Sequence, residues 1–280
     1  MELNPDPFTG PVIYGLGITC GDALAGEIRV NDIAFGTLAT GATALESIPI
    51  HGDLDAGENV AQLRIGTSED NLRSPATLMP GEPPATASAK LQLEGDEVSI
   101  SGDEMRITTH TFARDLWDAR EQAGAVMLPA VLSVNFQPRA GSPVALWANA
   151  RAASPSDVAE AVYAETAAIA ALLRDRNFEA YVGRTSLRRQ HRARCYPQGQ
   201  DAAGLREEEL DDLIRLSSAP DFTVRIAAKV GSTLRAQAKS RLFDWVDAQG
   251  EPIVTIQAGG QSFAVQHQYS LLEGSLQLVR

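Results

Sequence analysis

The chain has 280 residues, a formal net charge of −12 at pH 7 and 44% hydrophobic residues, which is typical of a folded protein with one large or two ordinary domains. A protein of this charge would repel phosphate over most approaches, so the composition argues against a nucleic-acid-binding or anionic-membrane-binding protein. No run of residues approaches the roughly 18 apolar positions that a membrane-spanning helix needs.

The charge is unevenly divided along the chain. Residues 1–150 contain 20 acidic and 8 basic side chains, whereas residues 151–280 contain 16 of each. This division favours two domains, an acidic one over residues 1–150 and a balanced one over residues 154–280. It also fits a basic protein partner for the acidic half.

The first half is predicted to be a β-sandwich, because short alternating segments recur without a long helical pattern between them. The expected strand segments are Val12–Ile18, Glu27–Phe35, Asn59–Ile65, Ala89–Leu93, Glu97–Ile100, Met127–Phe136 and Val144–Asn149. Asn31-Asp32 and Glu94-Gly95-Asp96 are expected to form hairpin turns. The Pro- and Gly-rich stretch Arg73–Thr86 is expected to be a loop.

The pattern changes to a helical one at Ser154, which is predicted to cap a helix that has Pro155 as its first residue. Further helical stretches are predicted over Phe178–Arg194 and Glu207–Leu216. Strands are then expected over Phe222–Lys229, Thr233–Lys239, Leu242–Val246, Pro252–Gln257, Ser262–Leu271 and Gly274–Val279. Helices followed by an antiparallel meander predict an α+β domain.

Cofactor and compartment signals are weak. Cys20 and Cys195 fall in different halves without metal-ligand spacing, so we expect two buried thiols rather than a disulfide, and no metal site. The segment Gly15–Gly21 approaches a dinucleotide-binding fingerprint, but its third glycine is one residue late and no helical pattern follows. We therefore expect no cofactor. The start, Met1–Pro7, lacks the features of a signal peptide, which predicts a cytoplasmic protein.

The second half resembles the NTF2-like cone fold, through the helical patterns Ser156–Arg176 and Glu207–Leu216 and the hairpin pattern of Tyr269–Arg280. Upstream, Ile28-Arg29-Val30-Asn31-Asp32 followed by Leu54-Asp55-Ala56-Gly57-Glu58-Asn59 resembles a galactose-binding-like β-sandwich, with Asp32 where glycine is usual. A sandwich joined to an NTF2-like domain is similar to uncharacterised bacterial proteins of secretion-system and toxin-immunity loci. This resemblance implies a non-enzymatic protein-binding role, such as an immunity protein that neutralises a toxin or secreted effector.

The acidic turn at Asp53, Asp55 and Glu58 is the first candidate site. Its carboxylates could contact a basic protein partner, since complementary charge speeds association. The alternatives are a calcium site in the sandwich and a solvated turn.

Arginines form the second candidate site. Arg184, Arg188 and Arg192 recur at every fourth position, which places them on one face of a predicted helix. They could bind an anion or an acidic partner. The alternatives are an exposed helix face and an internal dock for the acidic first domain.

The third candidate is an NTF2-like cavity with Tyr163, Tyr181 and His267, which would make the protein a small-ligand binder or an enzyme. His267 could act as a general base only with a carboxylate or tyrosine within hydrogen-bond reach. We assign no catalytic residue, because the sequence contains none of the motifs HExxH, GxSxG, P-loop or SxxK.

A carbohydrate-binding module in the first domain is a further alternative. It would need Trp117, Trp147 or Trp245 to be exposed as a stacking surface. These tryptophans are more simply expected to be core residues.

Overall fold

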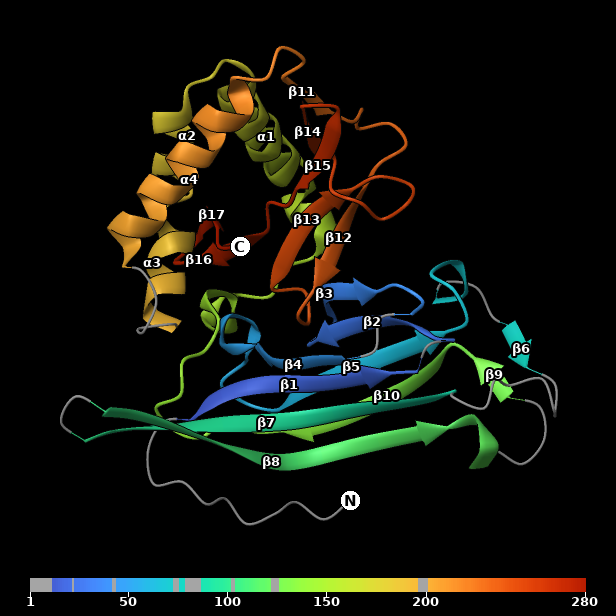
Figure 1. Cartoon of the computed structure of the whole chain (residues 1–280). Helices are drawn as coiled ribbons and strands as arrows, with labels where there is room; N and C mark the ends of the chain where they lie inside the picture. Colours follow the sequence, from blue (N-terminus) through green and yellow to red (C-terminus); the bar gives the residue numbers. More distant parts are fainter. Residues whose placement is uncertain are drawn as a thin grey trace. The chain divides into compact units, whose positions relative to one another are not determined.

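The computed structural model describes residues 12–21, 23–41, 44–72, 76–78, 87–101, 104–121, 126–195 and 201–280. Its backbone contacts divide the chain into two compact units, Met1–Val144 and Ala145–Arg280. The described residues form mostly β-strands together with four α-helices (Figure 1). The coarser part of the predicted fold class, a β-rich α+β chain, is therefore confirmed.

The first unit contains two four-stranded antiparallel sheets. One has the order β4-β1-β7-β8, made of Ala44–Pro49, Ile13–Cys20, Ser88–Ser101 and Glu104–Asp118. The other has the order β10-β5-β2-β3, made of Ala130–Phe136, Asn59–Gly66, Ala25–Val30 and Ile33–Leu38. A separate short pair consists of β6 (Ala76–Leu78) and β9 (Val126–Leu128).

The core of the first unit lies between these two sheets, as in a β-sandwich. The strand β5 alternates strictly between buried and half-buried positions over most of its length, which buries Ala61, Leu63 and Ile65. Strands β1 and β7 contribute Leu16 and Leu91 to the same apolar cluster. The period-2 pattern that predicted strands is thus the pattern that fills this core.

The predicted hairpin turn at Asn31-Asp32 is confirmed, with φ angles of 53° and 67° between β2 and β3. Asparagine and aspartate are among the few residues that adopt this left-handed region readily. The Asn31 side chain also donates to the Asp53 carbonyl oxygen at 2.9 Å and to Asn59 Oδ1 at 2.7 Å. The two segments that resemble a galactose-binding-like module therefore meet through Asn31 and Asn59.

The predicted turn at Glu94-Gly95-Asp96 is wrong. Strand β7 runs through it without a break, and Gly95 pairs with His110 of β8. A Cβ atom added to Gly95 would overlap the Phe112 ring and would lie 2.7 Å from Val12 Cγ1. This glycine therefore permits close packing within a strand rather than a chain reversal.

The structure differs from the sequence-based prediction in three other segments. The predicted strand Val144–Asn149 is wrong, because Leu146–Asn149 forms a short 3-10 helix. The predicted strand Met127–Phe136 is divided at Pro129 into β9 and β10. Within the expected loop Arg73–Thr86, Ala76–Leu78 forms strand β6, and the rest lies outside the described residues.

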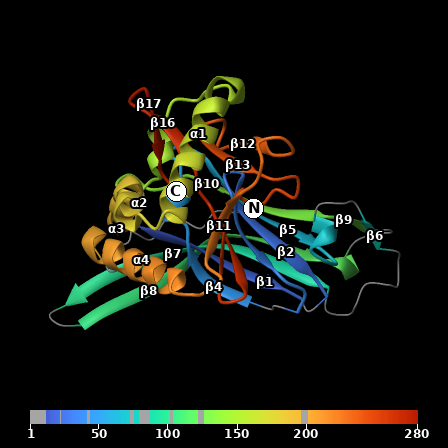
Figure 2. The same cartoon turned by 90° about the horizontal axis from the view of Figure 1, so that it is seen from above.

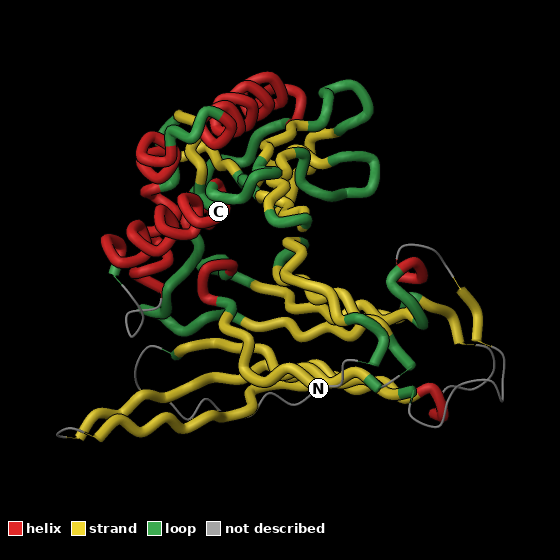
Figure 3. Tube along the Cα trace, turned by 45° about the horizontal axis from the view of Figure 1, so that its top comes forward, coloured by secondary structure: helices red, strands yellow, loops and turns green. Residues whose placement is uncertain are grey.

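The second unit contains all four α-helices, which Figures 2 and 3 show gathered beside its strands. They are α1 (Pro155–Arg174), α2 (Phe178–Arg184), α3 (Ser186–Cys195) and α4 (Ala202–Ser217). The start after Ser154 is confirmed, although the Ser154 side chain makes no capping hydrogen bond. Helix α4 begins earlier than predicted, where the Asp201 side chain accepts from the Gly204 N–H at 2.8 Å.

The strands of the second unit form two antiparallel sheets. One has the order β11-β14-β15, made of Thr223–Ile226, Val254–Ala258 and Gln261–Val265. The other has the order β12-β13-β16-β17, made of Thr233–Gln237, Leu242–Val246, Tyr269–Leu272 and Ser275–Leu278. The predicted strand Ser262–Leu271 is therefore two strands in two sheets, with His267 between them. The NTF2-like likeness stays a prediction.

Apolar side chains of helix α1, including Val162 and Leu173, pack in one cluster with Phe243 of β13, Ile256 of β14 and Tyr269 of β16. Both sheets thus share a core with the helices of this unit. Among the described residues, no helix is long and apolar enough to span a bilayer. Cys20 and Cys195 are both buried thiols, as expected.

The tryptophans behave as core residues. Trp147 and Trp245 are 1% and 7% exposed, and Trp117 is partly buried against the core of the first unit. The exposed stacking surface that the carbohydrate alternative needs is not provided by these three side chains.

His51 gives the first unit a pH-dependent stability. Its Nε2 accepts a hydrogen bond from the Tyr14 backbone N–H at 2.9 Å in a buried position, and only the neutral imidazole can accept. Burial lowers the pKa of His51 from 6.5 to about 4, against a smaller opposing effect of Asp96. The unfolded chain therefore binds more protons between these values, and stability falls as the pH drops through them.

We expect this residue to remove about 2 to 3 kcal/mol of unfolding free energy between pH 7 and pH 4.5. The variant H51Q keeps an acceptor for the Tyr14 N–H but has no proton to bind. Urea denaturation at the two pH values should show a smaller loss for H51Q than for the wild type. An equal loss in both proteins would contradict this assignment.

Candidate functional site

A pocket of about 500 Å³ lies in the second unit, lined mainly by α3 and α4, and we call it the arginine pocket. Its charged side chains are the guanidinium groups of Arg188, Arg189, Arg192 and Arg280 and the carboxylates of Glu208, Glu209 and Asp212. Gln266, Leu205 and Leu213 complete the lining. The pocket thus combines both signs of charge with an apolar wall.

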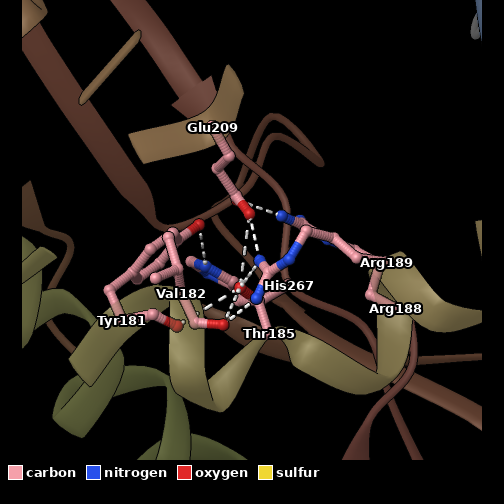
Figure 4. A network of polar contacts seen from close by, with 7 residues as sticks. All are labelled: Tyr181, Val182, Thr185, Arg188, Arg189, Glu209 and His267. Atoms are coloured by element: carbon pink, nitrogen blue, oxygen red, sulfur yellow. Dashed lines mark hydrogen bonds and ion pairs between the residues drawn. The ribbon is translucent and has the colours of Figure 1, made fainter. Parts of the chain in front are cut away.

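Glu209 connects two of these arginines. One carboxylate oxygen accepts from Arg188 and the other accepts from Arg189 (Figure 4). The exposed fractions of the side chains are 28% for Arg188, 6% for Arg189 and 19% for Glu209. Because these charges are largely removed from water, each depends on its partner for compensation.

Arg189 is fixed more firmly than Arg188. Its guanidinium also donates to the Val182 carbonyl oxygen and to Thr185 Oγ1, at the end of α2. Thr185 itself lies between α2 and α3 and donates to the Tyr181 carbonyl oxygen at 3.2 Å. These hydrogen bonds connect the junction of α2 and α3 to Arg189, which lines the arginine pocket.

The predicted arginine face is only partly correct. The stretch Phe178–Arg194 is not one helix, and Arg184 ends α2 and pairs with Glu165 of α1 at 3.0 Å. Arg188 and Arg192 both lie on α3 and both line the pocket. The structure therefore separates the first member of the predicted set from the other two.

The predicted cavity around Tyr163, Tyr181 and His267 is not assembled as expected. The Tyr181 hydroxyl lies 3.4 Å from His267 Nε2, and both side chains are buried (Figure 4). The small space beside His267, which Thr166 and Trp245 help to line, is too narrow to hold a water molecule. Tyr163 instead packs edge-on against Trp245, with ring centres 5.2 Å apart.

The Tyr181–His267 pair is neutral near pH 7. Burial, with a smaller contribution from the Arg188 charge, lowers the pKa of His267 to about 3. Burial also raises the pKa of Tyr181. His267 thus has a tyrosine within hydrogen-bond reach, but the space that Thr166 and Trp245 help to line beside it is too small for a substrate.

The acidic turn of the first unit is not one exposed cluster. Asp53 is 4% exposed, so its carboxylate is not available to a partner as predicted. Asp55 is half-buried, and its backbone N–H donates to Asn59 Oδ1 at 2.7 Å. Glu58 alone of the three is exposed. No three metal-ligating side chains gather in the part of the chain that the structure describes.

Three members of the arginine pocket carry no local sequence signal. Glu209 lies 20 positions from Arg189, and Gln266 and Arg280 come from beyond the helices. Only the spacing of Arg188 and Arg192 indicated the site.

Comparisons with known proteins identify no relative of this chain. No protein-family model matches the chain, and searches of curated proteins and of solved structures find no match either. The geometry of the site is therefore the basis on which we assign a function.

Removing Glu209 should destabilise the protein. The variant E209A leaves the buried Arg189 guanidinium without its charged partner, which we expect to cost about 2 kcal/mol of unfolding free energy. The variant E208A removes an exposed carboxylate of the same helix and should change this free energy by less than about 0.5 kcal/mol. Urea denaturation of both variants at pH 7 measures the difference, and equal effects would argue against a structural role for the Glu209 pairs.

Proposed function

We propose that the chain is a non-enzymatic binding protein whose second unit holds a small anionic ligand in the arginine pocket. The observation that carries this proposal is the convergence of Arg188, Arg192 and Arg280 on one pocket. Its volume of about 500 Å³ lies within the range of small-molecule sites.

The charges of the lining support an anionic group at α3. Glu209 compensates only one of the two positive charges that Arg188 and Arg189 bring to it. Arg192 lies one turn beyond Arg188 on the same helix face, so its guanidinium can approach the same ligand. The planar guanidinium group matches carboxylate and phosphate oxygens in pairs.

The test compares two arginines of one helix. Isothermal titration of the full chain with succinate and with inorganic phosphate should give saturable binding that weakens as salt rises. In R192A the affinity should fall about tenfold or more, because a charge-assisted hydrogen bond is lost. In R194A, which removes an exposed arginine of α3 outside the pocket lining, the affinity should stay the same. Equal affinities of the two variants, or no binding of either anion, would overturn the proposal.

A second candidate function is protein binding of the immunity type, through the first unit. The observation that favours it is the location of the whole net negative charge in residues 1–150, together with the exposure of Glu58. A basic toxin or effector would associate faster with a surface of this charge.

A pull-down at low and high salt from a lysate of the organism that encodes the chain tests this second candidate. We expect one stoichiometric basic protein that is lost as salt rises and is retained less well by E58K. The matched variant E121K changes another exposed acid of the same unit and should retain it. A partner that binds E58K and E121K equally would remove Glu58 from the interface, and no partner at low salt would contradict the function.

A further inference from the structure

We infer that the ligand of the arginine pocket is a zwitterion of about dipeptide size, with a cationic group, an anionic group and an apolar body between them. This inference rests on the proposed function and names the chemical class of its ligand.

On α3 and α4, two charged groups of the lining are left over after the internal ion pairs are formed. Glu209 is shared by Arg188 and Arg189, and Asp212 pairs with Arg215 at 2.6 Å. By contrast, Arg192 and Glu208 form no ion pair with any residue that the structure describes.

These two groups come from different walls. Arg192 belongs to α3 and Glu208 belongs to α4, and the two helices lie side by side in both views of the fold (Figures 1 and 2). Both side chains line the pocket and both residues are exposed. A ligand between the helices therefore meets one available positive charge and one available negative charge.

The carboxylates make the binding of a ligand that carries only negative charge weaker than that of a zwitterion, without preventing it. An anion held by Arg192 shares the pocket with Glu208, Glu209 and Asp212, and its repulsion from them opposes binding. A cationic group on the same ligand, placed near Glu208, replaces repulsion with attraction. Complementary charges at both ends thus select a zwitterion over a simple anion.

The middle of the ligand is expected to be apolar. Leu205 and Leu213 lie two turns apart on α4, and both line the pocket. Their side chains offer dispersion contacts and burial to apolar groups of a ligand. A volume of about 500 Å³ suits an apolar dipeptide better than a single small ion.

The test uses three matched probes on the full chain. Isothermal titration with L-leucyl-L-leucine, its N-acetyl derivative and its C-terminal amide separates the contributions of the two charges. We expect the unmodified dipeptide to bind about tenfold tighter than either derivative.

Two variants test whether Glu208 binds the cationic group of the ligand. E208Q should weaken the dipeptide about tenfold and leave the N-acetyl derivative unchanged or slightly tighter. E207Q changes an exposed acid of α4 outside the pocket lining and should alter neither affinity.

The outcomes separate a failure of the zwitterion inference from a failure of the proposed anion-binding function. If the N-acetyl derivative binds as tightly as the dipeptide and E208Q changes neither, the ligand is a simple anion, and only the zwitterion inference fails. If the probes bind but R192A affects none of them, the proposed function fails as well. If none of the three probes binds, the zwitterion inference is overturned, and the succinate and phosphate titrations decide the proposed function separately.

Discussion

Glu209 connects helices of the second unit by pairing with two arginines at once. Its carboxylate joins α4 to α3 through Arg188 and Arg189, and Arg189 extends the connection to α2 through the Val182 carbonyl oxygen. Without this carboxylate, the two adjacent guanidinium groups would repel each other and the buried Arg189 would lose its charged partner. This ion-pair network fixes the guanidinium groups of Arg188 and Arg189 where they line the arginine pocket.

The same network separates two chemically different regions of the second unit. The arginine pocket is charged and reaches solvent through exposed residues such as Arg192 and Glu208. The Tyr181–His267 pair is buried and neutral, partly because the charge of Arg188 disfavours a second positive charge on His267. The charged lining of the arginine pocket suits recognition by charge and hydrogen bonding, which is why we propose binding rather than catalysis.

Local patterns predicted the features that local physics controls. The alternation of β5, the left-handed turn at Asn31-Asp32 and the helix start at Pro155 depend on neighbouring residues alone, and all three are confirmed. Gly95 misled the prediction because its role depends on Phe112, which faces it from β8. The arginine pocket could be predicted only in part, since Glu209 meets Arg189 across 20 positions and no periodicity links them.

The central claim is that the α3 wall of the arginine pocket binds an anionic group. The most direct test is a ¹H–¹⁵N correlation spectrum of the arginine Nε–Hε groups in the full chain labelled with ¹⁵N-arginine, titrated with succinate at constant ionic strength. R192A and R194A assign the two signals by their absence. We predict a saturable shift of the Arg192 signal with no shift of the Arg194 signal. An unchanged Arg192 signal, or equal shifts of both, would contradict it.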